Sequence, residues 1–516
     1  MKQFILAALL FVCTQAYSQN IKVEKSEISA GKFYTNNKEI IATTFTFPAR
    51  IHLLKIDSAR EIAAVTLRDL TKNKKFLKPN GDFVLYDIAG ERVKWNKDIN
   101  FNTNGISYSN DIYFKITGTN NTYLHPETGA ELWTEPNDIY YVNHSQNIGL
   151  GYKYNFLKGD YTNSLEGIDM ATGKTIWKRD VKRNFGWNGT RLLDDTTLLI
   201  ASSGLHVINL KTGKGWDYNA VTGRNDYKAM IATNLLGIAA GVLTGTYFVR
   251  DKDVVSGLIS NIIKDSTNII FASREMLSSI DTTGKINWES VLDKDKTSKS
   301  NIIIRDDDII LINLGYAYFN NRVIDYGTPY MSVFNKKTGA QKYLSIVGEK
   351  KEAINSYDIS DDKTKVLFYF DNKISEYSFA DGSLINSRPF NSKEYGAPRF
   401  YIDKNMYLPV ENGGLKSINE KYPGKKIIFT TSDKIQVLDN DFNVTETIDR
   451  KDVHILIFEK GPFTFIRNDG KTKIYNNDLQ PVGELDISSD AEVVGNFIYD
   501  TKDNKIIKIN FDSFQN

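Results

Sequence analysis

The sequence predicts an all-β chain that closes into a ring of about eight four-stranded units, with seven to ten as the range. A glycine turn followed by tryptophan recurs along the chain, the glycines are spaced by about one such unit, and acidic turns introduce apolar runs. With 41% hydrophobic residues in 516, the chain can bury a large core, which excludes disorder as its main state.

Each recurring turn follows alternating apolar residues and, except at Gly382, has Asp, Asn or His three or four positions before its glycine. Glycine accepts the left-handed backbone conformation of a bulged hairpin turn, so each copy predicts a β-hairpin. Five of the six tryptophans follow such a glycine by three to five residues. The turn glycines are Gly90, Gly129, Gly173, Gly213, Gly284, Gly339 and Gly382, and the tryptophans are Trp95, Trp133, Trp177, Trp216 and Trp288.

The spacing of the repeats indicates how the hairpins assemble. The first four turn glycines are 39, 44 and 40 residues apart, the size of a four-stranded propeller blade. Residues 198–214 and 269–285 align without a gap at an offset of 71, and residues 437–449 and 474–486 at an offset of 37. One hairpin cannot bury its apolar face alone, and no capping repeats are evident, so we predict radial closure. The hairpin count is nine.

The D-x-x-T-G-K-x-x-W turn resembles the repeat of the PQQ-like (quinoprotein-type) β-propellers, from about residue 80 to 390 and more weakly to 510. The resemblance implies a ring, often of eight blades, in which the five tryptophans dock against neighbouring blades. Tyr343 and Asn386 stand where later repeats depart from the pattern, so less regular blades are expected there. At fold level the chain most resembles the propeller subunit of the outer-membrane barrel-assembly machinery. We expect one propeller domain over residues 19–516.

Residues 1–18 are typical of a secretory signal: a positive residue, a short apolar stretch, then small and polar residues. The stretch is too short to span a bilayer, and cleavage is expected after Ser18. A hydrophobic first strand is the alternative. Lipid attachment at Cys13 is disfavoured because the preceding Val12 is not small. The prediction is an exported protein, periplasmic or secreted.

The composition and motifs predict no catalytic, cofactor-binding or metal-binding residue, and no cofactor. The formal charge of +2 argues against a nucleic-acid partner. Quinone-dependent members of the resembled family have an adjacent cysteine pair, a calcium site and a catalytic carboxylate, whereas Cys13 is the only cysteine here. Residues 439–443 look like the start of a calcium loop, but Val444 and Arg450 replace its glycine and glutamate, so a turn is favoured. The lysine run at 72–78 is interpreted as a solvated face in preference to a phosphate or lipid site.

Residues 226–263 are predicted to form a helical insertion, because the interval from Gly213 to Gly284 exceeds a blade by about 30 residues. Residues 229–249 are uncharged with glycines four apart, and an amphipathic stripe follows. A helical hairpin packed on the propeller is favoured; an exposed hairpin that binds a partner or dips into a membrane, and a membrane span, stay open. The candidate interaction residues are Gly237, Gly241, Gly245, Val254, Leu258 and Ile262.

The functional prediction is a non-catalytic, exported propeller that serves as a scaffold and binds another envelope protein. One alternative is a degenerate quinoprotein-type enzyme or a small-ligand sensor that uses the central funnel, and another is an adhesion module. An enzyme would show convergent polar side chains and a titratable pair in the axial pocket. Fold resemblance alone does not decide among these.

Overall fold

The computed structural model describes residues 21–514 apart from 58–59, 110–111, 119, 182–186, 188, 203, 221–258, 320–321 and 402–404. The predicted signal segment, the cleavage site and Cys13 lie outside the described residues. Strands dominate the described part, and its helical elements are short. These are α3 (Ser392–Tyr395), α4 (Ile418–Lys421), η2 (Arg450–Asp452) and η3 (Phe511–Phe514). None of the described helices is long and apolar enough to cross a membrane.

Eight separate four-stranded antiparallel sheets occur in the described part of the chain. The first four are β3 (Ile51–Asp57), β4 (Ile62–Leu67), β5 (Asn80–Asp87), β6 (Arg92–Asn100); β7 (Asn104–Ser109), β8 (Ile112–Thr117), β9 (Asn120–Leu124), β10 (Glu131–Glu135); β11 (Asn137–Asn143), β12 (Ile148–Asn155), β13 (Asp160–Asp169), β14 (Thr175–Asp180); and β15 (Gly189–Asp194), β16 (Thr197–Ala201), β17 (Gly204–Asn209), β18 (Gly215–Asn219).

The other four sheets follow in chain order, two of them with inserted strands. They are β19 (Ile263–Asp265), β20 (Asn268–Ala272), β21 (Met276–Asp281), β22 (Ile286–Val291); β23 (Ser300–Arg305), β24 (Asp308–Asn313), β27 (Tyr330–Asn335), β28 (Gln341–Ile346); β29 (Ser356–Ile359), β30 (Lys365–Tyr369), β31 (Lys373–Ser378), β32 (Leu384–Pro389); and β33 (Pro398–Tyr401), β36 (Lys426–Thr430), β37 (Lys434–Leu438), β38 (Val444–Asp449). The inserted strands are β25 (Tyr316–Phe319), β26 (Arg322–Asp325), β34 (Met406–Pro409) and β35 (Leu415–Ser417).

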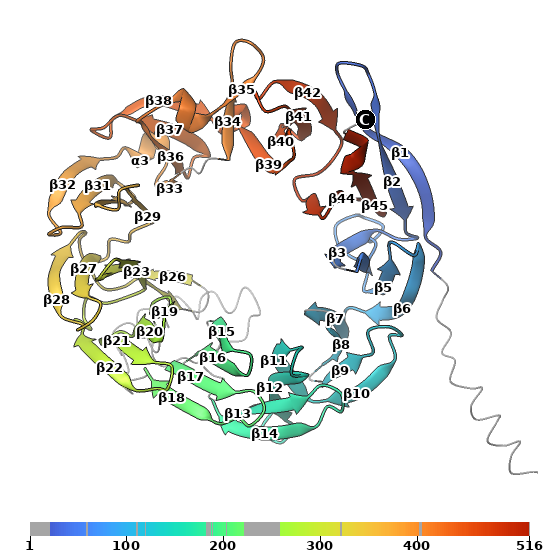
Figure 1. Cartoon of the computed structure of the whole chain (residues 1–516), viewed down its shortest axis with the longest axis horizontal. Helices are drawn as coiled ribbons and strands as arrows, with labels where there is room; N and C mark the ends of the chain where they lie inside the picture. Colours follow the sequence, from blue (N-terminus) through green and yellow to red (C-terminus); the bar gives the residue numbers. More distant parts are fainter. Residues whose placement is uncertain are drawn as a thin grey trace, which may run out of the picture.

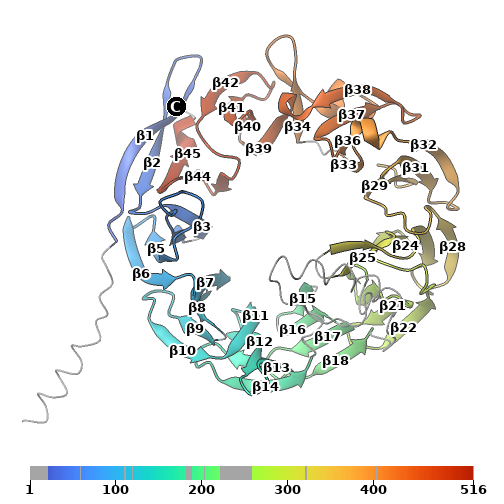
Figure 2. The same cartoon turned by 180° about the vertical axis from the view of Figure 1, so that it is seen from behind.

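The sheets stand around a ring, as in a β-propeller (Figures 1 and 2). The first strand of each sheet lies toward the centre and the fourth lies at the rim. This arrangement explains the burial of the strands: all six residues of β4 are buried because neighbouring sheets cover both of its faces. The rim strand β14 instead alternates exposed and half-buried residues, because it has neighbours on one edge only.

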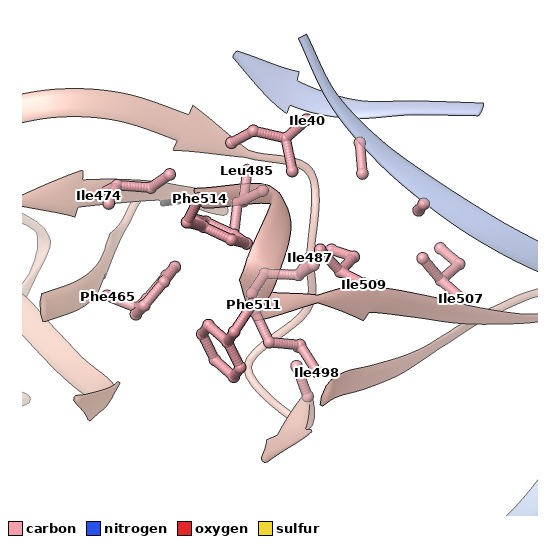
Figure 3. Packing of buried hydrophobic residues seen from close by; sticks show 13 residues of the cluster. Ile40, Phe465, Ile474, Leu485, Ile487, Ile498, Ile507, Ile509, Phe511 and Phe514 are labelled. Atoms are coloured by element: carbon pink, nitrogen blue, oxygen red, sulfur yellow. The ribbon is translucent and has the colours of Figure 1, made fainter. Parts of the chain in front are cut away.

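Both ends of the chain meet in an eleven-stranded sheet that closes the ring. Strand β2 pairs with β45, and β1 pairs with both β2 and β42. Phe511 and Phe514 of η3 pack against Phe465 in the core of this sheet, with ring centroids 6.0 and 5.8 Å away (Figure 3). Besides β34 and β35, the strands of this sheet are β1 (Glu24–Phe33), β2 (Glu39–Thr46), β39 (His454–Lys460), β40 (Phe463–Asn468), β41 (Lys471–Tyr475), β42 (Pro481–Leu485), β43 (Glu492–Val494), β44 (Phe497–Lys502) and β45 (Lys505–Asn510).

The predicted helical insertion is described only at its end. Gly237, Gly241, Gly245, Val254 and Leu258 lie outside the described residues. Ile262 precedes β19 without helical structure, and Ile263 is the first residue of that strand. The prediction that the amphipathic helix continues to residue 263 is therefore wrong, because Ile263 pairs with Ile270 of β20.

Candidate functional site

The tryptophan that follows each glycine turn reaches the turn of the next sheet. The indole N–H of Trp95, on β6, donates to the carbonyl of Pro126 at 2.8 Å. A β-carbon added to Gly129 would lie 2.6 Å from the Trp95 ring, and Gly129 has a φ of +65°. Glycine is thus required there both by the left-handed backbone and by the approach of the ring.

The same contact recurs at successive sheets around the ring. In four cases the acceptor carbonyl belongs to the residue three positions before the turn glycine, as with Pro126 and Gly129. The further indole hydrogen bonds are Trp133 to Met170 (2.8 Å), Trp177 to Leu210 (2.6 Å), Trp216 to Thr282 (3.0 Å) and Trp288 to Lys336 (3.1 Å). They face Gly173, Gly213, Gly284 and Gly339, all with positive φ.

Two positions without tryptophan use other donors, and one predicted glycine behaves differently. The hydroxyl of Tyr343 donates to the Phe379 carbonyl at 2.8 Å, beside Gly382, and burial raises the pKa of Tyr343 to about 12. Beyond Asn386, Arg388 donates from Nε to the Asp441 carbonyl at 3.2 Å. Gly90 does not hold the left-handed position of its turn.

The left-handed residue of that first turn is Glu91, with a φ of +52°, which corrects the prediction for Gly90. The carboxylate of Asp87 accepts the Gly90 N–H at 2.8 Å. Asp169, Asn209 and Asn335 accept the N–H three positions on in the same way, and the fourth position is glycine in their turns. Here the glycine stands at the third position, so the positive φ of the fourth position falls on Glu91.

These contacts divide the ring into two faces. Each tryptophan lies close to its own turn and touches the next one, so successive turns such as those at Gly129 and Gly173 share one end of the ring, here named the turn face. Because the strands are antiparallel, the connections between second and third strands lie at the opposite end. We name that end the loop face; it includes residues 68–79 between β4 and β5 and residues 156–159 between β12 and β13.

The loop face carries the most exposed large apolar side chains of the described residues. Leu157 is 99% exposed, Phe156 67% and Phe76 68%, all in connections between second and third strands. Val291, 79% exposed, ends the rim strand β22 at the same face, and Val323, 58% exposed, belongs to the β25–β26 hairpin inserted between β24 and β27. Phe156 and Leu157 are adjacent in one turn, whereas Phe76, Val291 and Val323 belong to three other sheets, so the exposed apolar groups are spread along this face of the ring.

One of these connections has local support that fixes its apolar tip, and another places its apolar side chain among exposed lysines of the sequence. Tyr154 packs edge-on against both Phe156 and Tyr161, each with ring centroids 5.1 Å apart, and the Asn155 carboxamide accepts the Leu157 N–H at 3.0 Å. In the other connection, exposed lysines surround Phe76. These are Lys72, Lys74, Lys75 and Lys78. The lysine run predicted as a solvated face is therefore exposed, and it brackets an exposed aromatic ring.

A cavity of about 360 Å³ also lies among loop-face connections. Its walls come from η2, the inner strand β39, the end of β40 with the following turn, and the connection after β42. The lining includes Arg450, Ile455, Arg467, Asp469 and Ser489. The sequence pattern did not indicate this cavity, because three separate segments of the chain form it.

The titratable pairs lie between strands and away from the ring centre. Asp82 of β5 stands opposite Asp98 of the rim strand β6, and burial together with the Asp98 carboxyl raises the pKa of Asp82 to about 6. His206 Nδ1 and an Asp217 carboxylate oxygen are 2.6 Å apart, and Arg179 of the preceding sheet pairs with Asp217 at 2.8 Å. In the described part of the chain, no three His, Cys, Asp or Glu side chains are placed to hold a metal ion.

No protein-family model matches the chain, and no curated protein matches it in sequence. Among solved structures, BamB from Moraxella catarrhalis is 14% identical, with 76% of this chain and 98% of that chain covered at a TM-score of 0.31. Apo AztD from Citrobacter koseri is 12% identical, with 72% and 92% covered and a TM-score of 0.30. A eukaryotic initiation factor is 8% identical, with 89% and 95% covered and a TM-score of 0.31. At identities and TM-scores this low, these matches carry no information about the function of the chain.

Proposed function

We propose that the chain is an exported, non-catalytic β-propeller that acts as a scaffold and docks another envelope protein on its loop face. The observation that supports this most is the asymmetry of exposed apolar groups. Leu157, Val291, Phe76, Phe156 and Val323 exceed every other large apolar side chain of the described residues in exposure, and all five lie on the loop face. The turn face presents polar turns instead, such as those capped by Asp169 and Asp281.

The same proposal assigns ten blades to the ring and a structural role to its aromatic contacts. The eight separate sheets supply eight blades. Strands β39 to β42 form a ninth blade. Strands β43, β44 and β45 form a tenth with β2, which comes from the N-terminal part of the chain. In this proposal Trp95, Trp133, Trp177, Trp216 and Trp288 dock each blade on the next.

Export and the predicted insertion enter the proposal through the sequence and the topology. Residues 1–18 have the character of a secretory signal. The insertion connects the rim strand β18 to the inner strand β19, so the connection starts and ends on the loop face. Residues 221–258 lie outside the described residues; we propose that this segment takes part in the same docking surface and that its apolar stretch makes the membrane contact.

The test is cross-linking in intact cells followed by identification of the captured protein. Leu157→Asp combined with Phe76→Asp should abolish capture, and so should replacing residues 222–257 with a short linker. The replaced segment stops before Ile259, which is buried. Leu384→Asp is the matched control, because Leu384 is 55% exposed but lies on the rim strand β32. Capture of the same partner by the loop-face variants would refute docking at this face.

A further inference from the structure

The loop-face cavity has the size and form of a small-molecule site. Its volume of about 360 Å³ falls within the range of ligand pockets, about 300–1,000 Å³. The aliphatic residues of the lining, here called the apolar wall, are Val453 and Ile455, Leu456 and Ile457 of the inner strand β39. A molecule with an apolar body therefore finds a complementary surface on this side.

The lining also contains cationic residues, here called the cationic wall. Arg450, Lys451 and Arg467 line the cavity, against the single carboxylate of Asp469. Nη1 of Arg467 is buried, and no group in the described part of the chain accepts a hydrogen bond from it. A buried guanidinium N–H without an acceptor costs free energy, and proteins normally pair such a group. Arg467 also lines the cavity, so an anion bound there would pair the charge of its guanidinium.

The cationic wall is held in place by its neighbours. The Asn468 carboxamide donates to the backbone carbonyls of Lys451 at 2.9 Å and Val453 at 3.2 Å, which ties η2 to the end of β40. The guanidinium of Arg450 lies over the Phe429 ring, 4.7 Å from its centroid. Groups fixed in this way lose little freedom when a ligand binds.

The connection that carries Ser489 is also fixed. The backbone N–H and the hydroxyl of Ser488 both donate to the Asp500 carboxylate, at 2.7 and 2.5 Å, which holds the connection that carries Ser489. Both carboxylate oxygens of Asp500 are therefore engaged with Ser488.

We propose that this cavity binds a small organic anion, with its carboxylate or phosphate on Arg467 and its apolar body against β39. Arginine suits both head groups because its planar fork donates two parallel hydrogen bonds to either. The site is independent of protein docking on the loop face, since the ligand is a small molecule and the contact residues differ from the exposed tips.

The test is isothermal titration calorimetry of the purified chain with hexanoate, hexyl phosphate, inorganic phosphate and hexanol. At least one of the two hexyl anions should bind at one site, about tenfold or more tighter than inorganic phosphate and hexanol, because it uses both walls. Arg467→Gln should weaken this binding by about tenfold or more, the effect of losing a charged hydrogen bond. Lys211→Gln, an exposed lysine in a turn-face turn, is the matched control and should leave the affinity unchanged.

Three results would overturn the proposal: no saturable binding of either hexyl anion below about 10 mM, binding that Arg467→Gln leaves unchanged, or equal affinity for inorganic phosphate and the hexyl anions. The last would show an adventitious ion only. Arg467→Gln should unfold at the same temperature as the parent chain or higher, because it removes an unpaired buried donor. If Arg467→Gln fails to fold, Lys451→Gln provides the second variant, with the same loss of affinity expected.

Discussion

Trp177 offers the sharpest test of how neighbouring sheets are held together. Its ring lies between two glycines: Gly167 of its own sheet, on the paired strand β13, and Gly213 of the next sheet. Its indole N–H donates to the Leu210 carbonyl at 2.6 Å. Trp177→Ala removes both the ring and the hydrogen bond, and neither glycine has a side chain that could fill the space.

The expected loss follows from these contacts. Truncating a large aromatic side chain in a packed site costs about 3–5 kcal/mol, and a hydrogen bond contributes about 1 kcal/mol of net stability. Trp177 is half-buried, so the lower end, about 3 kcal/mol, is expected. Trp177→Phe keeps much of the packing and removes the donor, and should cost about 1 kcal/mol.

The assay is urea unfolding followed by circular dichroism, with the slope compared between variants so that a change in midpoint reports stability. Gly213→Ala approaches the same contact from the other side, because the new methyl group would lie 2.6 Å from the Trp177 ring at a φ of +70°. It should destabilise the protein by more than 1 kcal/mol. An unchanged midpoint for Trp177→Ala would refute the docking role, whatever Gly213→Ala does.

Two further predictions concern charge and ring closure. The folded pKa of Asp82 is about 6, above its ordinary value of 3.8. The contribution of Asp82 to stability is therefore complete below pH 4 and is lost as the pH rises through 6. By urea midpoints, Asp82→Asn should be more stable than the parent chain at pH 7.5, by about 1 kcal/mol after allowance for solvent screening, and equal to it near pH 3.5. Equal midpoints at pH 7.5 would contradict this. A β-carbon on Gly31 would collide with the Glu484 carbonyl, so Gly31→Ala should lower the free energy of unfolding by about 1–3 kcal/mol and speed amide exchange in β42. Gly105→Ala is the control, because the space around its β-carbon is open, and it should change neither the stability nor the exchange.

The sequence predicted the repeated unit of the fold because the relevant signals are local. The turn glycine, its capping residue and the following tryptophan lie within ten residues, and each acts on the nearest turn of the next sheet. Gly90 shows the limit of this reasoning. Its turn has the same residue types as the others, but its glycine stands three residues after the capping Asp87 and not four, as in the turns at Gly173 and Gly213. The positive φ therefore falls on Glu91.

The candidate site was less predictable for a physical reason. The cavity combines Arg450 of η2, Arg467 of β40 and Ser489 of the connection after β42, and no spacing motif relates residues from three separate segments. The exposed tip at Phe156 and Leu157 did have a local signal, since two adjacent large apolar residues stand in a short turn between tyrosines. The stripe that ends at Ile263 was misjudged because a short apolar run fits a strand as well as a helix.

The contacts between sheets change in kind around the ring, and the change follows the order of the chain. Where one sheet follows another in sequence, one side chain reaches the turn of the next sheet beside the apolar core that the sheets share: tryptophan in five cases, then Tyr343, then Arg388. The closing contact joins segments about 450 residues apart, as in the hydrogen bond from Tyr34 to Glu484, and carries the largest loop entropy. There a ladder of backbone hydrogen bonds takes the place of an aromatic side chain, because β1 pairs with β2 on one side and with β42 on the other. A ladder of main-chain hydrogen bonds forms and breaks cooperatively, so we expect the propeller to open at β1 in one step. Loss of one aromatic side chain weakens a single contact between sheets and leaves the propeller closed.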